Sequence, residues 1–262
     1  MQQSPILIIK NLHVAFKSES GLNEVLCGIS YNLYSDEILG IVGESGSGKS
    51  VASLAIMGLL PLKSGVTTLG EVIFNAENLI DCSQKQLESI RGKKIAMIFQ
   101  EPMSALNPSI CCGKQVQEIL LQHTNITTKE ANKEVVRLFN AVKLPEPKKT
   151  YKKYPHEISG GQLQRVMIAM AIACKPEILI ADEPTTALDV TVQKEIIALL
   201  KTLQKEFKMS VIFISHDLAL VSEIADRVLV MYKGAIVEKG DTKSVFKNPQ
   251  KEYTNALIGA RP

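Results

Sequence analysis

Short runs of apolar residues recur along the chain, and stretches of helical spacing separate them. The runs are three to five residues long and contain no charged residue, which is typical of strands buried on both faces of a sheet. Strands that alternate with helices predict an α/β fold with a mainly parallel sheet. The runs lie at residues 6–9, 38–42, 72–74, 95–99, 178–181, 211–214 and 228–232.

Helical spacing is clearest over residues 192–207 and 113–144. In the first stretch every third or fourth residue is apolar, so these residues share one helix face. The second stretch has no strand pattern, and Thr127 with Glu130 predicts a capping box at a helix start. After it, helical spacing predicts an apolar face of Ala131, Val135, Leu138 and Val142. We therefore expect an inserted helical lobe there. The residues 230–237 predict a hairpin that turns at Gly234.

Residues 43–50 match a phosphate-binding loop at every specified position. They follow the predicted strand 38–42 and precede an apolar helix predicted over residues 50–60, in the order that such a loop requires. Its glycines let successive backbone N–H groups point at phosphate oxygens. The chain is therefore predicted to handle ATP or GTP, with Lys49 at the β- and γ-phosphates and Ser50 on Mg²⁺. The candidate nucleotide-binding residues here are Gly43, Glu44, Ser45, Gly46, Ser47, Gly48, Lys49 and Ser50.

Two adjacent acids, Asp182 and Glu183, follow the predicted strand 178–181. At the carboxyl end of a strand, Asp182 is placed to hold Mg²⁺ through water, and Glu183 to accept a proton from an attacking water. Adjacent acids are common in surface loops, so the pair alone is a weak signal. Together with the phosphate loop it becomes a strong one.

Two other polar residues follow predicted strands. Gln100 comes directly after residues 95–99, and His216 comes shortly after residues 211–214. Gln100 could contact the metal or the lytic water, and His216 could donate a hydrogen bond to the γ-phosphate. Each also has a purely structural interpretation as a polar residue at a strand end, and the residues alone leave both interpretations open.

A second anion site is predicted where a long helical pattern begins at residue 160. Glycines at a helix start expose backbone N–H groups, and a serine adds a hydroxyl. The alternative is an ordinary helix cap by Ser159 with Gln162 three residues later. Two phosphate sites in one chain make that alternative unattractive. The residues concerned are Ser159, Gly160, Gly161 and Gln162.

Composition narrows the classes of function. At 262 residues the chain suits one domain with an inserted lobe, and its net charge of +3 is too small to indicate a nucleic-acid surface. The five cysteines form no CxxC pair, so neither a disulfide framework nor a zinc site is expected. We see no signal peptide and no apolar stretch of about 18 residues, so we expect a cytosolic protein whose membrane association, if there is any, goes through a partner.

These motifs resemble, in type and order, the nucleotide-binding subunits of ABC transporters over nearly the whole chain. By resemblance, residues 43–50 are Walker A, Gln100 is the Q-loop, residues 159–162 are the signature, and Asp182 with Glu183 is Walker B. The resemblance further assigns Ala187-Leu188-Asp189 to the D-loop, His216 to the switch histidine, and Phe16 to the aromatic that stacks on adenine. Phenylalanine stands where tyrosine is usual, and Ile158 where leucine is usual.

The resemblance implies a P-loop NTPase fold with a RecA-like, mainly parallel sheet and an antiparallel β subdomain. It further implies one ABC ATP-binding domain over residues 1–262, with an inserted helical subdomain over approximately residues 101–157. Members work as head-to-tail dimers that hold each ATP, with Mg²⁺, between the Walker A of one subunit and the signature of the other. The catalytic residues that the resemblance implies are Glu183, which would polarise the water, and Lys49 and His216, which would stabilise charge on the transferring phosphoryl group. The helical subdomain docks a transmembrane permease subunit, and Gln100 links it to the nucleotide.

Three stretches, residues 97–108, 181–191 and 248–257, resemble the dipeptide, oligopeptide and nickel importers. That branch implies a second, related but different ATP-binding subunit, and indirectly an extracytoplasmic substrate-binding protein. It also implies transmembrane permease subunits, through which this chain would sit at the cytoplasmic face of the membrane. Its usual His-Pro-Tyr-Thr sequence is reduced here to Tyr253-Thr254. The chain resembles the short members without a cysteine-rich tail, so no iron–sulfur cluster is expected.

Peptides are the expected substrate class, with nickel as the alternative. A non-transport ABC ATPase acting on nucleic acid or ribosomes would normally carry a coiled-coil insertion or a second cassette, and neither is seen. A GTPase or kinase would lack the signature at residues 159–162. An exporter ATPase is disfavoured by the branch resemblance and by the absence of a fused membrane domain.

Overall fold

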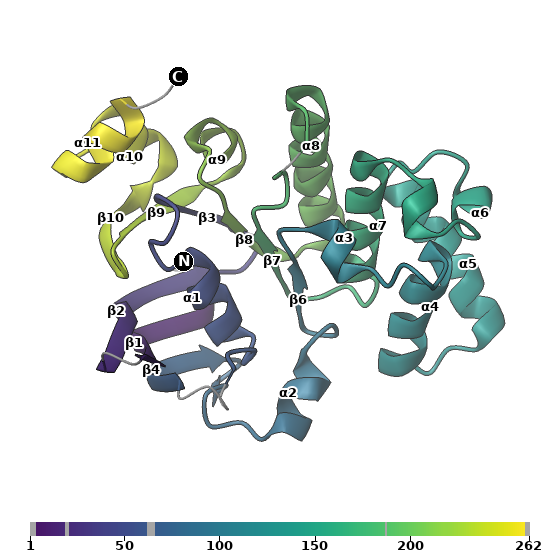
Figure 1. Cartoon of the computed structure of the whole chain (residues 1–262), viewed down its shortest axis with the longest axis horizontal. Coiled ribbons are helices and arrows are strands. Elements are labelled where there is room, and N and C mark those ends of the chain that lie inside the picture. The colour runs from purple at the N-terminus through teal and green to yellow at the C-terminus, as the bar shows by residue number, and fades with distance from the viewer. Residues whose placement is uncertain (1–3, 19–20, 62–65, 187, 260–262) are drawn as a thin grey trace. The chain divides into compact units, whose positions relative to one another are not determined.

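The computed structural model describes residues 4–18, 21–61, 66–186 and 188–259 (Figure 1). It forms two compact units. Unit 1 consists of Met1–Glu88 and Ser210–Pro262, and unit 2 of Ser89–Met209. The α/β class with a mainly parallel sheet and an additional antiparallel sheet, predicted from the sequence, is confirmed.

The buried core of unit 1 is a set of parallel strands. β3 (Ile38–Val42) pairs in parallel with β8 (Ser210–Ile214) on one side and with β9 (Arg227–Tyr232) on the other. Every residue of β3 and β8 is buried, which explains why these strands appear in the sequence as unbroken apolar runs. Their predicted positions are confirmed to within one residue.

A hairpin extends this sheet at the far side of β9. β10 (Ala235–Asp241) runs antiparallel to β9. The two turn residues, Lys233 and Gly234, both have positive φ, at 45° and 80°. Two successive positive φ values are the geometry of the tight turn that suits twisted hairpins. The hairpin predicted at Gly234 is confirmed.

A separate antiparallel sheet in unit 1 has the strand order β2-β1-β4-β5. The sequence predicted only residues 6–9 and 72–74 of it and missed β2. The pairing of β1 with β2 contains several register shifts, and each shift interrupts the alternation by which a half-buried strand is recognised. The strands are β1 (Pro5–Ser18), β2 (Gly21–Tyr34), β4 (Val66–Phe74) and β5 (Glu77–Asn78).

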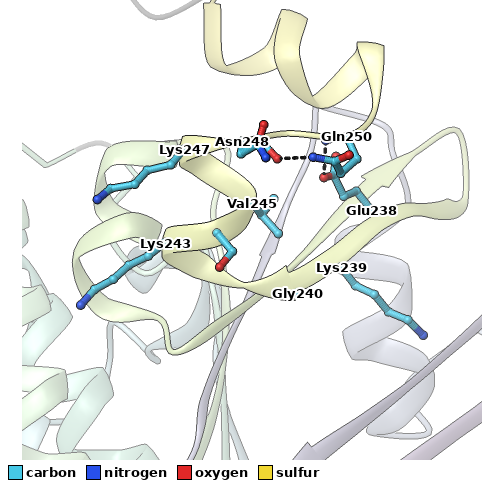
Figure 2. A pocket seen from close by; sticks show the side chains of 9 residues that line it. Glu238, Lys239, Gly240, Lys243, Val245, Lys247, Asn248 and Gln250 are labelled. Carbon is cyan, nitrogen blue, oxygen red and sulfur yellow. Dashed lines mark hydrogen bonds between the residues drawn. The ribbon is translucent and has the colours of Figure 1, made fainter.

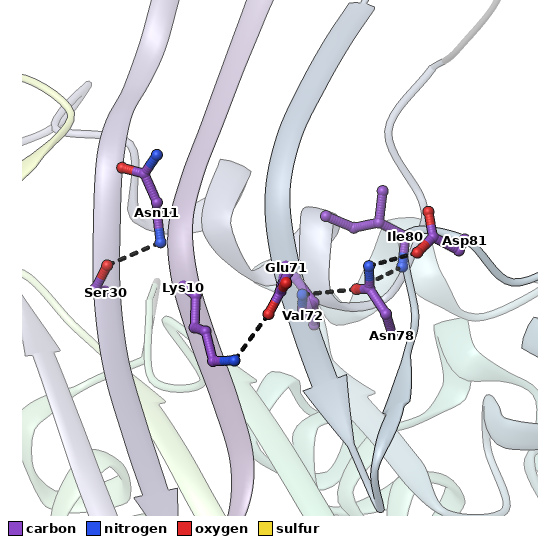
Figure 3. Close-up of polar contacts among 8 residues, drawn as sticks. All are labelled: Lys10, Asn11, Ser30, Glu71, Val72, Asn78, Ile80 and Asp81. Carbon is purple, nitrogen blue, oxygen red and sulfur yellow. Dashed lines mark hydrogen bonds and ion pairs between the residues drawn. The ribbon is translucent and has the colours of Figure 1, made fainter.

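One of these irregularities lies where β1 passes β4 (Figure 3). Asn11 has a φ of 46°, and its N–H donates to Oγ of Ser30 at 2.8 Å. Gly70 lies so close that a Cβ atom there would be 2.3 Å from the carbonyl oxygen of Asn11. Beside it, Lys10 pairs with Glu71 at 2.9 Å. The bulge therefore depends on glycine, because any side chain at position 70 would collide with the neighbouring backbone.

The helix after β3 is shorter than the sequence predicted. α1 spans Lys49–Ile56, whereas helical spacing predicted residues 50–60. Gly58 has a φ of 60°, and its N–H donates to the carbonyl of Ala55. A left-handed glycine stops a helix even where the apolar pattern continues. The other helices with residues in unit 1 are α2 (Gln84–Ile90), α9 (Leu218–Ile224), α10 (Thr242–Lys247) and α11 (Glu252–Gly259).

Unit 2 contains a parallel strand pair. β6 (Ile95–Ile98) pairs with β7 (Ile178–Asp182), with Ile95 opposite Ile178. The predicted strand 95–99 ends one residue early, since Phe99 lies outside β6 and is 41% exposed. The helices of unit 2 are α3 (Pro102–Ala105), α4 (Cys112–His123), α5 (Thr128–Ala141), α6 (Pro147–Thr150), the 3₁₀ helix η2 (Pro155–Glu157), α7 (Gly160–Ile172) and α8 (Val190–Phe207).

The predicted capping box at the start of α5 is confirmed. Thr127 is the N-cap, its side chain accepts from the N–H of Glu130, and Glu130 accepts in return from the N–H of Thr127. The predicted apolar face, Ala131, Val135, Leu138 and Val142, is fully buried. Over residues 101–157, all of which are described, the regular elements are helices. Their identity as one inserted lobe stays a prediction.

The apolar face predicted for α8 is also confirmed. Ile196, Leu199 and Leu203 are buried, and Val192 and Phe207 near the helix ends are half-buried. Across the described ranges, no helix combines the length and the apolar character needed to cross a membrane.

Candidate functional site

Glycines shape the phosphate loop, which runs from the end of β3 into α1 in unit 1. Gly43, Gly46 and Gly48 have φ values of 155°, 79° and 100°, a range that favours glycine. A Cβ atom on Gly43 would lie 2.2 Å from the carbonyl oxygen of Met231, and one on Gly48 would lie 2.8 Å from Cδ2 of Leu26. The loop therefore requires glycine both for its backbone angles and for its packing against neighbouring strands.

The start of α1 offers backbone N–H groups to an anion. Its N-cap is Gly48, which has no side chain to accept from these groups, and its first turn contains no acidic residue. Ser50 is exposed in this first turn. Helix N-termini of this kind bind phosphate, because the N–H groups and the helix dipole both favour negative charge. The loop and helix start thus fit a nucleotide phosphate.

The ammonium group of Lys49 lies against the phosphate loop. Lys49 is 5% exposed, and its Nζ donates to the carbonyl oxygens of Gly43 and Glu44, both at 2.8 Å. Oγ of Ser47 lies 3.5 Å away. A buried ammonium group needs such acceptors. They hold the positive charge beside the loop at which a phosphate would bind.

In unit 2, the two predicted acids lie where β7 ends. Asp182 is the last residue of β7 and is 5% exposed. Glu183 has a φ of 46°, which is uncommon for a residue other than glycine and is typical of strained functional positions. Its Oε2 atom accepts from Nε2 of Gln100 at 3.1 Å. The structure therefore brings together Gln100 and Glu183, which the sequence placed at the ends of different strands.

The same carboxylate oxygen has a second donor that sequence reasoning did not single out. Oγ1 of Thr186 donates to Oε2 of Glu183 at 2.9 Å, and the N–H of Thr186 donates to the carbonyl of Glu183 at 3.2 Å. The only sign of this turn in the sequence is that Thr186 follows Glu183 by three residues, the spacing of a tight turn. The backbone at Glu183 is left-handed in this turn, which the sequence does not reveal.

Three residues were predicted as Mg²⁺ ligands. Ser50 in unit 1 offers a hydroxyl, and Gln100 and Asp182 in unit 2 offer an amide and a carboxylate oxygen. Oxygen donors of these kinds are those that Mg²⁺ prefers. The donor chemistry therefore fits this metal, and the assignment of these three ligands stays a prediction.

The predicted signature residues open α7 in unit 2. Ser159 is the N-cap, and its Oγ accepts from the N–H of Gln162 at 3.4 Å, as the ordinary capping alternative requires. Ser159 and Gly160 are nevertheless exposed, and the first turn of α7 contains no acidic residue. A Cβ atom on Gly161 would lie 2.9 Å from Cγ1 of Val192. This helix start is both capped and accessible to an anion from outside.

The remaining predicted residues have simpler surroundings. Asp189 is the N-cap of α8 and accepts from the N–H of Val192 at 3.0 Å, while Ala187 lies outside the described residues. His216 is exposed between β8 and α9. Phe16 is half-buried in β1, opposite Asn23 of β2. Their D-loop, switch and adenine-stacking roles stay predictions.

The sequence and the fold were compared with those of known proteins. The model of the ABC transporter family matches residues 26–186, a range that contains the phosphate loop, Gln100, the signature and both acids. The chain belongs to the ABC transporter family. The family resemblance inferred from the motifs is therefore confirmed.

Several curated ABC proteins match 98% of this chain. It is 49% identical to the dipeptide transport ATP-binding protein DppD of Bacillus subtilis and covers 77% of that protein. It is 48% identical to the oligopeptide transport ATP-binding protein OppD of the same organism and covers 72% of it. Identity to the glutathione import ATP-binding protein GsiA of Escherichia coli (strain K12) is 47%, over 42% of that longer protein.

Solved ABC structures share the fold. The ATP-binding cassette MJ0796, in a dimeric post-hydrolysis state with ADP and Pi, is similar with a TM-score of 0.81 and 28% identity, over 90% of this chain and 98% of that one. The protein cbiO1 from Clostridium perfringens, part of the ABC transporter complex cbiONQ, is similar with a TM-score of 0.79 and 29% identity, over 94% and 92% of the two chains. The predicted P-loop NTPase fold is confirmed.

Proposed function

We propose that this chain is the ATP-hydrolysing subunit of an ABC importer that takes up dipeptides or oligopeptides. The observation that carries the proposal is its identity of 49% and 48%, over nearly its whole length, to ATP-binding proteins named for dipeptide and oligopeptide transport. The phosphate loop and the Glu183 carboxylate supply the two functions that ATP hydrolysis needs, which are phosphate binding and proton acceptance.

In the proposed reaction, the loop N–H groups and Lys49 hold the phosphates of ATP. Glu183 accepts a proton from the attacking water, while Gln100 and Thr186 keep its carboxylate in place through hydrogen bonds of 3.1 and 2.9 Å. His216 donates a hydrogen bond to the γ-phosphate. Ser50, Gln100 and Asp182 would hold Mg²⁺, which would neutralise charge on the phosphates.

The accessible start of α7 supports a shared site. We assign Ser159, Gly160, Gly161 and Gln162 to the ATP of a second ATP-binding subunit, a related but different chain. Two nucleotides then close the pair, and hydrolysis reopens it. The pair sits at the cytoplasmic face of the membrane through permease subunits, and a substrate-binding protein delivers the peptide on the other side.

The shared site can be tested with Ser159→Arg. A long cationic side chain would occupy the anion site at the start of α7, so we expect nucleotide binding by the single subunit to persist and ATP-driven pairing to be lost. Size-exclusion chromatography with light scattering, with the partner subunit and ATP, measures this pairing. Ser109→Arg, at another exposed serine of unit 2, is the matched control. Normal pairing of Ser159→Arg would refute the shared site.

The substrate class requires the complete transporter. We would reconstitute the chain with its permease, partner and substrate-binding subunits and compare ATPase stimulation by di- and oligopeptides with that by Ni²⁺. Stimulation by peptides alone is the expected result. Stimulation by Ni²⁺ alone would replace peptide by nickel as the substrate, and stimulation by neither would contradict the importer branch.

A further inference from the structure

The C-terminal helix of unit 1 makes a direct contact with the phosphate loop. Oη of Tyr253, at the start of α11, accepts a hydrogen bond from the N–H of Glu44 at 3.2 Å, across 209 residues of sequence. The match to the ABC family model ends at residue 186. The contact therefore joins the nucleotide loop to a part of the chain that this match does not cover.

Glu44 is one of the two loop residues whose carbonyl oxygens hold Lys49. Its carbonyl oxygen accepts from Nζ of Lys49 at 2.8 Å and from the N–H of Ser47 at 3.2 Å. Tyr253 holds the opposite, N–H side of the same residue. A displacement of Glu44 would thus move an acceptor of the lysine that we assign to the ATP phosphates.

Residues 44–46 form an exposed arm of the phosphate loop. A Cβ atom built on Gly46 meets no atom within 4 Å. By contrast, the two ends of the loop are packed, since Gly43 abuts Met231 and the carbonyl of Ser47 accepts from the N–H of Gly234 at 3.1 Å. The Tyr253 hydroxyl therefore supports the loop in its exposed part.

The Tyr253 ring is itself held in place. It packs on the ring of Tyr232, the last residue of β9, with 4.2 Å between ring centroids. Lys233 lies over the other tyrosine ring, with its Nζ 5.1 Å from the centroid of Tyr232. Burial raises the pKa of the Tyr253 hydroxyl, so this group stays neutral at physiological pH.

The segment that precedes α11 is anchored as well. Glu238 of β10 accepts from the N–H of Gln250 at 2.8 Å and from the N–H of Lys251 at 3.2 Å. The side chain of Gln250 donates to the carbonyl of Asn248 at 2.9 Å. Figure 2 shows Glu238, Gln250 and Asn248 together at the edge of the pocket between β10 and α10. These hydrogen bonds fix the segment from which the Tyr253 side chain reaches the phosphate loop.

We propose that Tyr253 is a positioning residue for ATP binding, which holds the exposed arm of the phosphate loop through the N–H of Glu44. The proposal rests on ATP being the nucleotide that the loop binds. Losing one neutral hydrogen bond from a preformed binding loop weakens ligand binding by about two- to ten-fold. The loss affects how the loop is held before binding, so turnover at saturating ATP stays unchanged.

The test compares Tyr253→Phe with Tyr232→Phe in the full chain. Both variants lose one hydroxyl and keep the paired rings, but within the described residues the Tyr232 hydroxyl makes no hydrogen bond. Titration with MgATP should give a Kd raised about two- to ten-fold for Tyr253→Phe alone. Equal Kd values for the parent and Tyr253→Phe, or an equal loss in both variants, would overturn the proposal.

Amide hydrogen exchange without nucleotide gives a second readout. The N–H of Glu44 should exchange faster in Tyr253→Phe than in the parent and in Tyr232→Phe, and unchanged exchange would contradict the contact itself. If the parent chain fails to bind MgATP while exchange at Glu44 responds to Tyr253→Phe, the proposed function fails and the tyrosine contact remains. If the parent binds MgATP and neither readout responds, only the positioning role fails.

Discussion

The two units hold the residues that we assign to ATP binding and hydrolysis by different means. In unit 1 the backbone makes most of the contacts. Glycines shape the phosphate loop, and the carbonyl oxygens of Gly43 and Glu44 hold Lys49. In unit 2 side chains carry the arrangement, since Gln100 and Thr186 both donate to the carboxylate of Glu183. The contrast matches the division of labour that we propose, in which unit 1 binds phosphate and unit 2 supplies the base.

The difference has consequences for substitution. A backbone site depends on the absence of side chains, as the 2.2 Å approach of a Cβ atom at Gly43 to Met231 shows. A side-chain site depends on individual functional groups, so replacing a single atom can remove its chemistry while its shape is kept. Substitutions in the phosphate loop of unit 1 should therefore weaken binding, and substitutions at Glu183 of unit 2 or at its hydrogen-bond donors should slow hydrolysis.

The largest effect is expected for Glu183→Gln. An amide of nearly the same shape cannot accept the proton from water, so turnover should fall by roughly 10² to 10⁴. ATP binding should be retained, because the phosphate loop is unaltered. A phosphate-release assay on the purified chain measures the loss, and Glu195→Gln, at an acid on α8 that pairs with Arg165, is the control. Unchanged turnover in Glu183→Gln would rule out the catalytic assignment.

The next largest effect is expected for Lys49→Ala in unit 1. Losing a charged hydrogen-bond donor to the phosphates should weaken MgATP binding by about ten- to a hundred-fold. Calorimetric titration measures the affinity. Lys10→Ala removes a lysine whose ion pair with Glu71 is exposed, so it should bind ATP as the parent does. Equal affinities for the parent and Lys49→Ala would show that the loop does not use its lysine.

A smaller effect is expected for Thr186→Val, which removes the hydroxyl that donates to Glu183 and keeps the side-chain shape. With the hydrogen bond from Thr186 lost, the carboxylate should be less well oriented. We expect turnover to fall by about two- to ten-fold at unchanged ATP affinity. Thr202→Val on the exposed side of α8 is the control, and a change confined to affinity would contradict the positioning role.

The smallest effect concerns stability alone. Thr127→Ala removes the N-cap of α5 and should lower the free energy of unfolding by about 1 kcal/mol, the usual cost of losing such a cap. Urea denaturation followed by circular dichroism measures this loss. Thr128→Ala changes the adjacent exposed threonine, which is not the cap. ATP affinity should be the same in both variants, and a loss of affinity in Thr127→Ala would link this helix start to the nucleotide.

The sequence predicted best what depends on local pattern. Strands β3, β7 and β8 are buried along their whole length, so unbroken apolar runs revealed them, and the Thr127 capping box follows from neighbouring residues. Prediction from the sequence failed where the backbone conformation departs from the one that the apolar pattern indicates. The register shifts between β1 and β2 hid β2, and the left-handed Gly58 ended α1 early.

The candidate site residues also divide into those that local motifs predicted and those that only the structure brings together. The phosphate loop, the acid pair and the signature are contiguous motifs, and the sequence indicated all of them. The contact between Gln100 and Glu183 spans 83 residues, and that between Glu44 and Tyr253 spans 209. Such contacts depend on how the strands are arranged in space, and a single sequence does not determine that arrangement residue by residue.

The central claim is that the phosphate loop of unit 1 binds ATP and that Glu183 of unit 2 is the base for its hydrolysis. The most direct test measures MgATP affinity and the rate of phosphate release side by side for Lys49→Ala and Glu183→Gln. The account predicts that Lys49→Ala loses affinity, whereas Glu183→Gln keeps the affinity of the parent and loses turnover. A Glu183→Gln protein that loses affinity as far as Lys49→Ala does, or that hydrolyses ATP at the parent rate, would contradict it.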